Sequence, residues 1–130
     1  MEHSSPQDVE YLTSDEMAGL PFSEAVRVGN LLFLSGQLGR DASGRVVSGG
    51  IAAETHQTLE NIKAALERHG SSLDRVVKAT VFLADMGEWA EMNQVYITFF
   101  PQHLPARSAL GATGLALGAR VEIECIAVVG

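Results

Sequence analysis

The stretch that most constrains the fold is Val121–Val128, because its residues alternate with the two-residue period of a β-strand. The carboxylates of Glu122 and Glu124 share one face of this strand. An unpaired carboxylate is costly to bury, so that face must meet water, a partner charge or a ligand. Arg107, just after Pro105, is the candidate for that partner charge or for a ligand clamp. The other face carries small and apolar residues, as expected for a core: Val121, Ile123, Cys125 and Ala127.

Length and composition predict one globular domain. The chain has 130 residues, of which 46% are hydrophobic and 19% charged, enough for one core and too few residues for two. The formal net charge of −7 disfavours nucleic acid and anionic membranes as partners, because both need a basic surface. We therefore expect neither a nucleic-acid nor a membrane partner.

Three features predict a cytoplasmic protein. The single cysteine, Cys125, allows no disulfide within the chain, and no stretch is long and apolar enough to span a bilayer. Residues 1–8 are polar and acidic, unlike a signal peptide. We expect residues 1–20 to form a loosely held N-terminal arm with a short edge strand at Tyr11–Leu12, and residues 21–130 to form the single domain.

Local patterns predict strands and helices across this domain. Residues 25–36 read as a hairpin around Gly29–Asn30, which tolerates the positive φ angles of a two-residue turn. Gly70 suits the C-terminal cap of a helix whose buried stripe is Thr55, Leu59, Ile62 and Leu66. A strand follows at residues 76–83. We expect one of its faces to carry Val77, Ala79, Val81 and Leu83, and the other Val76, Lys78, Thr80 and Phe82.

A second helix is predicted after this strand. Asp85 and Glu88 have the spacing of a capping box, and Pro101 ends the helical pattern. We expect the apolar stripe of this helix to belong to the core: Trp89, Met92, Tyr96 and Phe99.

Two helices beside one mixed sheet predict a two-layer α+β domain with both helices on one face of the sheet. The other face is too apolar for open solvent and too charged for a core. We therefore expect it to pack against the same face of other subunits, with polar clefts at the seams. Its residues would include Val76, Lys78, Phe82, Glu122, Glu124, Ile126 and Val128.

Several segments occur together along the chain: Ser35–Gln37, Asn61–Ile62, Val77–Leu83, Met92–Tyr96, Pro105–Ser108 and Val121–Val128. In combination they resemble the Rid family, also called YjgF, over about residues 21–128. The resemblance implies a chorismate-mutase-like α+β fold and a homotrimer with clefts between subunits. It also implies a deaminase that hydrolyses reactive 2-imino acids, such as 2-iminobutanoate and 2-iminopropanoate, and their enamine tautomers to 2-keto acids and ammonia.

The same resemblance implies roles for individual residues. Arg107 matches the arginine that grips the substrate carboxylate, and Glu122 matches the glutamate near the attacking water. Ser35, Gly36 and Asn93 match positions that line the cleft.

Two positions depart from the family pattern. Phe22 stands where a tyrosine is frequent, and Ala109 stands where a cysteine is common. We keep both as candidate substrate-binding positions. The change at Phe22 leaves open other imine or enamine substrates, including aminomuconate-type ones.

These residue types suit imine hydrolysis. A guanidinium takes a carboxylate through two parallel hydrogen bonds, which fixes the position and plane of the adjacent carbon. A carboxylate on the neighbouring strand could then hold or deprotonate a water, and later return a proton to the departing ammonia. Glu124 shares the face of Glu122 and could exchange roles with it or pair with Arg120. Neither a metal nor a cofactor is required.

Each candidate also has a structural interpretation. Arg107 could be a surface arginine, and Asn93 a helix amide bonded to nearby backbone. Ser35 lacks the sequence context of a nucleophile, so we expect it to make a hydrogen bond in the cleft. No zinc site is expected, because the histidines have no ligand-like spacing: His3, His56, His69 and His103.

Two other functions stay open. A trimeric small-metabolite-binding or chaperone-like protein would keep the cleft and Arg107 without hydrolysis. Endoribonuclease activity has been attached to the resembling family in general. The acidic chain and the lack of a paired histidine acid and base argue against it here.

Overall fold

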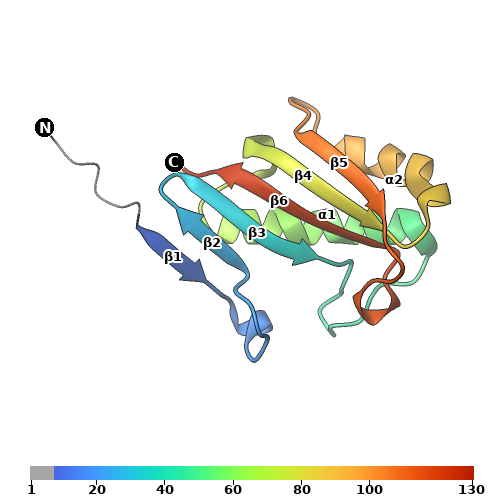
Figure 1. Cartoon of the computed structure of the whole chain (residues 1–130), viewed down its shortest axis with the longest axis horizontal. Helices are drawn as coiled ribbons and strands as arrows, with labels where there is room; N and C mark the ends of the chain where they lie inside the picture. The colour runs from blue at the N-terminus through green and yellow to red at the C-terminus, as the bar shows by residue number, and fades with distance from the viewer. Residues whose placement is uncertain (1–7) are drawn as a thin grey trace, which may run out of the picture.

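The computed structural model describes residues 8–130 and contains one six-stranded sheet with two helices on one of its faces (Figure 1). The strands lie in the order β1-β2-β3-β6-β4-β5, and every neighbouring pair is antiparallel except β4 and β5. The predicted two-layer α+β domain is confirmed. The elements are β1 (Val9–Leu12), β2 (Ala25–Val28), β3 (Leu31–Gln37), α1 (Gly50–Arg68), β4 (Val76–Leu83), α2 (Trp89–Tyr96), β5 (Ala106–Gly111) and β6 (Val121–Val128).

The N-terminal arm contributes an edge strand to the sheet. β1 pairs with β2 in antiparallel register, Tyr11 opposite Val26 and Leu12 opposite Ala25. This strand starts two residues earlier than the short segment expected from the sequence. Residues 1–7 of the arm, with His3, lie outside the described part of the chain, and the domain boundary at residue 20 stays a prediction.

The hairpin of β2 and β3 forms as expected. Val28 pairs with Leu31, so Gly29 and Asn30 make the two-residue turn, and Gly29 has a φ of 60° that suits glycine. This hairpin brings β3 beside β6, with Leu34 opposite Cys125.

The core lies between the sheet and the two helices. The predicted stripe of α1 is completely buried, and so is the predicted apolar face of β6. Burying each large aliphatic side chain stabilises the fold by about 1.5–3 kcal/mol, so this layer fixes the sheet against the helices. The largest of these buried side chains are Leu32, Leu59, Ile62, Leu66, Leu83, Met92 and Ile123.

The start of β4 differs from the sequence prediction. Val76 is buried and Val77 is 47% exposed, the reverse of the expected faces. The cause is a register shift against β6: Val76 pairs with Ala127 but Lys78 pairs with Ile126, so Val77 is an extra residue that inverts the alternation before it. From Lys78 onward the predicted faces hold.

The start of the second helix also differs. Asp85 accepts a hydrogen bond from the backbone N–H of Gly87 at 2.8 Å, within a 3-10 turn at Met86–Glu88 that precedes α2, and no capping box forms. Glu88 instead accepts a hydrogen bond from Arg120 at 2.8 Å. Trp89 is 44% exposed and is not a core residue, whereas Met92 and Tyr96 are buried as expected.

Candidate functional site

The two carboxylates of β6 lie on the face of the sheet that the helices leave bare. Glu122 pairs with Phe82 of β4, and Glu124 pairs with Thr80. Burial raises the pKa of Glu122 above its ordinary value, and the nearby charge of Glu124 raises it further. Glu122 therefore holds a proton more readily than an exposed glutamate, as suits a group that both takes and returns one.

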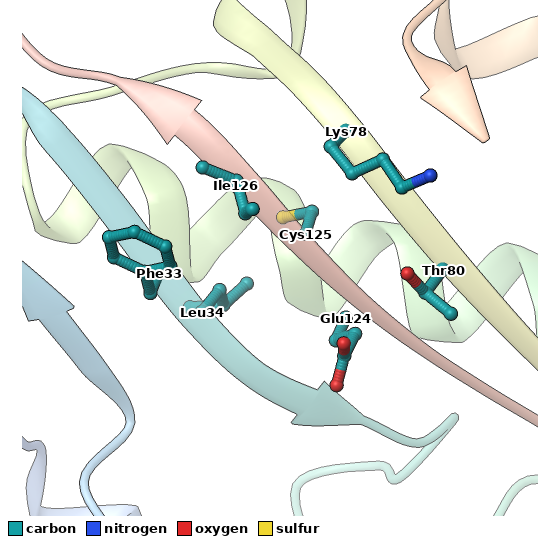
Figure 2. A pocket seen from close by; sticks show the side chains of 7 residues that line it. All are labelled: Phe33, Leu34, Lys78, Thr80, Glu124, Cys125 and Ile126. Carbon is teal, nitrogen blue, oxygen red and sulfur yellow. The ribbon is translucent and has the colours of Figure 1, made fainter. Parts of the chain in front are cut away.

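A shallow pocket lies in the middle of the bare face, and it contains Glu124 but not Glu122. Figure 2 shows Glu124 on β6 beside Thr80 on β4, with Lys78 farther along β4, across from Ile126. The amine of Lys78 donates a hydrogen bond to the Ser108 hydroxyl at 3.3 Å. The structure thus places the two carboxylates in different surroundings. The full lining is Phe33, Leu34, Lys78, Thr80, Glu124, Cys125 and Ile126.

Glu122 lies directly against Gly36 of β3. A Cβ atom on Gly36 would lie 2.0 Å from Glu122 Oε2, so the carboxylate would have to move from its present place. The register between β3 and β6 shifts between Leu34 and Gln37, which is where Gly36 lies. The missing side chain at Gly36 is therefore what gives the carboxylate its place.

Ser35, next to Gly36 on β3, holds the chain segment that contains Phe22. Its hydroxyl donates to the backbone carbonyl of Ser23 at 2.6 Å, and its N–H donates to the carbonyl of Glu24 at 2.9 Å. The Ser35 hydroxyl thus donates to backbone, and its role in lining the cleft stays a prediction. Phe22, one residue before Ser23, is 49% exposed.

Glu24 anchors this segment to the end of α1. It is 2% exposed and accepts hydrogen bonds from Arg68, at 3.1 and 2.8 Å, and lies 2.7 Å from His69 Nε2. Burial opposes ionisation of Glu24, but these hydrogen bonds outweigh it and lower its pKa. Sequence reasoning missed this cluster, because no spacing rule connects Glu24 with residues so far along the chain.

Arg107 lies on the opposite side of the sheet, on the edge strand β5. It pairs with the buried Ala79, which places it on the helix side. Its Cζ atom lies 4.7 Å from the ring centroid of Tyr96 and 6.0 Å from that of Trp89, both on α2. Within residues 8–130 the guanidinium has no hydrogen bond or ion pair, so its N–H donors remain available.

Asn93 and Ala109 lie on the same side of the sheet as Arg107. Asn93 lies on α2 between the two aromatic residues that contact Arg107, and Ala109 follows Arg107 on the same side of β5. The Oδ1 atom of Asn93 and the hydroxyl of Tyr96 are buried and have no partner in the described chain. Thr55 Oγ1 and Glu88 Oε1 are in the same state, so unpaired buried atoms are not confined to the surroundings of Arg107.

The predicted site residues therefore form two groups that do not meet within one protomer. We call Arg107, Asn93 and Ala109 the arginine group, and Phe22, Ser35, Gly36 and Glu122 the glutamate group. The expectation that Arg107 pairs with a carboxylate of β6, or acts from the strand next to it, was wrong. Strand β4 separates β5 from β6, and the side chains of Arg107 and Glu122 leave the sheet on opposite faces.

Three further observations concern metal binding, Cys125 and membrane insertion. In the part of the chain that is described, no three or more histidine, cysteine, aspartate or glutamate side chains are grouped so that they could hold a metal ion. Cys125 is buried, and burial raises the pKa of its thiol to about 12, so it behaves as a core residue. Over residues 8–130, neither helix has the length and apolar character needed to cross a bilayer.

Comparisons with known proteins agree on one family. The family described as Endoribonuclease L-PSP matches residues 13–129. A Bos taurus protein named 2-iminobutanoate/2-iminopropanoate deaminase is 48% identical over 111 residues, 85% of this chain and 81% of the relative. Saccharomyces cerevisiae Protein HMF1 is 46% identical over 110 residues, 85% of each chain. The crystal structure of RidA from an Antarctic Psychrobacter superimposes with a TM-score of 0.82 at 35% identity, covering 97% of this chain and all of that one.

Proposed function

The chain belongs to the YjgF/RidA family, described as Endoribonuclease L-PSP, and we propose that it is a hydrolytic deaminase of reactive 2-imino acids and their enamine tautomers. Relatives named 2-iminobutanoate/2-iminopropanoate deaminase support this proposal. The observation that carries it is the guanidinium of Arg107, which is stacked on aromatic rings and has no acidic partner in the described chain.

In the proposed reaction, Arg107 binds the substrate carboxylate with two parallel hydrogen bonds and so orients the imine carbon. Asn93 contributes to the cleft from α2, on the same side of the helix as Trp89 and Tyr96. Glu122 takes a proton from a water that adds to the imine carbon, and then returns it to the nitrogen. The hydroxyl of the resulting carbinolamine then passes its proton, through Glu122, to the same nitrogen, and the carbon–nitrogen bond breaks to leave a 2-keto acid and ammonia.

This mechanism requires more than one protomer. We propose a homotrimer in which the arginine group of one protomer meets the glutamate group of the next. Support comes from the bare sheet face, where Phe33 is 40% exposed beside Ile126 and Val128, because such a face is normally covered. The proposed partners are thus a small carboxylate substrate and two copies of the same chain, in the cytoplasm and without a cofactor.

Phe22 and Ala109 are the positions at which we expect substrate preference to be set. Phe22 is exposed at the end of the segment that Ser35 holds, so it is free to face a neighbouring protomer. Phe22→Tyr restores a hydroxyl at this place. A higher kcat/KM of this variant on 2-iminopropanoate would indicate that the hydroxyl is what the native protein lacks.

A second function is favoured by the same observation. The unpaired guanidinium of Arg107 suffices to bind a carboxylate, so a metabolite-binding protein without hydrolysis would use it equally well. The family description also mentions endoribonuclease activity, which the net charge of −7 disfavours. Any RNA cleavage should therefore disappear on further purification, whereas deamination should stay with the protein.

The proposal is tested by 2-keto acid formation from 2-iminopropanoate and 2-iminobutanoate, generated in place by an amino-acid oxidase, with semicarbazide as the competitor for the imine. We expect wild type to accelerate the reaction and Arg107→Ala to lose roughly 100-fold in kcat/KM, because two charge-assisted hydrogen bonds are worth about 3 kcal/mol. Arg45→Ala, at an exposed turn, is the matched control and should resemble wild type. Equal kcat/KM values for wild type and Arg107→Ala would show that the proposed mechanism is wrong.

A further inference from the structure

Three residues of α2 lie in a row on the side of the helix next to Arg107, and burial in the core does not explain all of them. Trp89, Asn93 and Tyr96 are four and three residues apart, so they follow one side of the helix. Arg107 contacts the aromatic rings at both ends of this row. Tyr96 is 5% exposed, but Trp89 is 44% exposed, which is unusual for a tryptophan that serves only packing.

Arg107 is held differently from other arginines of this protein. Arg120 binds Glu88 at 2.8 Å, and Arg68 binds Glu24 at 2.8 Å, so both spend N–H donors on protein acids. Arg107 has no such acidic partner in the described chain, and its Cζ atom lies over the rings of Tyr96 and Trp89, 4.7 and 6.0 Å from their centroids. A stacked guanidinium keeps its donors free, because they lie in its plane and point away from its edge.

We propose that Tyr96 and Trp89 are positioning residues that hold the Arg107 guanidinium by stacking, so that its donors are oriented for a carboxylate before the substrate arrives. This proposal rests on the carboxylate-binding role assigned to Arg107 above. An acidic partner would restrain the guanidinium more strongly but would compete with the substrate for the same donors. Aromatic rings restrain it without competing.

The proposal assigns the positioning of Arg107 to the ring of Tyr96 and not to its hydroxyl. The hydroxyl is buried without a partner in the described chain, and burial raises its pKa, so it stays neutral. A hydroxyl that bound the substrate would make Tyr96→Phe as harmful as loss of the ring. A stacking role predicts that Tyr96→Phe retains the affinity.

The test compares aromatic with aliphatic replacements at both positions: Trp89→Phe, Trp89→Leu, Tyr96→Phe and Tyr96→Leu. Two readouts are used: KM and kcat for 2-iminobutanoate, and the Kd of its product, 2-oxobutanoate, measured by calorimetry. We expect the leucine variants to raise KM and Kd by about three- to tenfold with kcat within about twofold, and the phenylalanine variants to stay near wild type. Trp89→Leu needs no core repacking, so it remains informative if Tyr96→Leu fails to fold.

A double-mutant cycle separates this role from a structural one. If Trp89 acts through Arg107, Trp89→Leu should add nothing to the loss of 2-oxobutanoate binding already caused by Arg107→Ala. Additive losses would overturn the proposal, and so would an unchanged KM and Kd in Trp89→Leu, or equal losses in Tyr96→Phe and Tyr96→Leu. The binding arm also works without hydrolysis. If the deaminase proposal is wrong, turnover will be absent although 2-oxobutanoate still binds. If the stacking proposal is wrong, the Kd for 2-oxobutanoate will not change when the rings are replaced.

Discussion

The arginine group and the glutamate group place their charges in opposite ways. Arg107 is stacked on rings at the edge of the sheet, with no acid in contact within the described chain. Glu122 fills the space above Gly36 at the other face, near another carboxylate that raises its pKa. The two opposite charges are thereby kept apart within one protomer.

A third cluster shows what happens when such charges do meet. Glu24 and Arg68 form an ion pair of 2.8 Å, with Glu24 almost fully buried. Their polar atoms are committed to each other, so this pair fastens a segment to α1 and has little left for a ligand. The separation of Arg107 from Glu122 therefore keeps both available for a substrate.

Mixing two inactive variants tests most strongly whether the two groups act together across protomers. Arg107→Ala and Glu122→Ala should each be nearly inactive alone. After co-refolding in equal amounts, clefts that combine an intact arginine group with an intact glutamate group from different protomers should restore about a quarter of wild-type activity, as random assembly predicts. The measurement is 2-keto acid formation before and after mixing.

The control is each variant refolded alone, at the same total concentration. A mixture as inactive as its components would show that the two groups do not complement one another between protomers. The proposed trimeric cleft would then be wrong, even if the stacking of Arg107 on α2 were right.

Gly36→Ala sharpens the description of the glutamate group. The new methyl would lie within 2.0 Å of Glu122 Oε2, so the carboxylate must move away from its place. We expect kcat to fall roughly ten- to a hundredfold, because small displacements of a reacting group have large effects on rate, with a smaller change in 2-oxobutanoate binding. Gly114→Ala is the matched control, since a Cβ there meets nothing within 4 Å. Equal kcat values for the two variants would contradict the proposal that Gly36 sets the position of the Glu122 carboxylate.

The fold could be predicted well from the sequence because burial patterns are local. The stripe of α1, the hairpin at Gly29 and the alternation of β6 each follow from residue order alone. The errors came where backbone geometry departs from a simple period. The extra residue Val77 inverted the start of β4, and the 3-10 turn at Met86–Glu88 replaced the capping box.

The site could be predicted only as a set of residues and not as an arrangement. Resemblance pointed to Arg107 and Glu122, but which face each occupies depends on strand order, with β4 between their strands. The stacking of Trp89 beside Arg107 and the anchor at Glu24 depend on contacts between distant segments, which no spacing rule reveals. An apolar stripe looks the same in a core helix and in one that presents rings to a cation.

The smallest expected effect concerns the stability cost of Glu122. Burial and Glu124 raise its pKa in the folded protein above the ordinary 4.5, so the folded state binds the proton more tightly than the unfolded state. Its contribution to stability is therefore fully present below the ordinary pKa and is lost as the pH rises through the raised value.

Glu122→Gln cannot ionise, so its stability should not fall in this pH range. We expect its Tm to exceed that of wild type at pH 7.5 and the difference to shrink towards pH 4, while its turnover falls. Glu67→Gln, on the exposed side of α1, serves as the control, and its Tm should follow that of wild type at both pH values.

A Tm of Glu122→Gln below that of wild type at pH 7.5 would mean that the ionised carboxylate is stabilised in the assembled protein, for example by the arginine group of a neighbouring protomer. The two groups would then already be paired before any substrate binds.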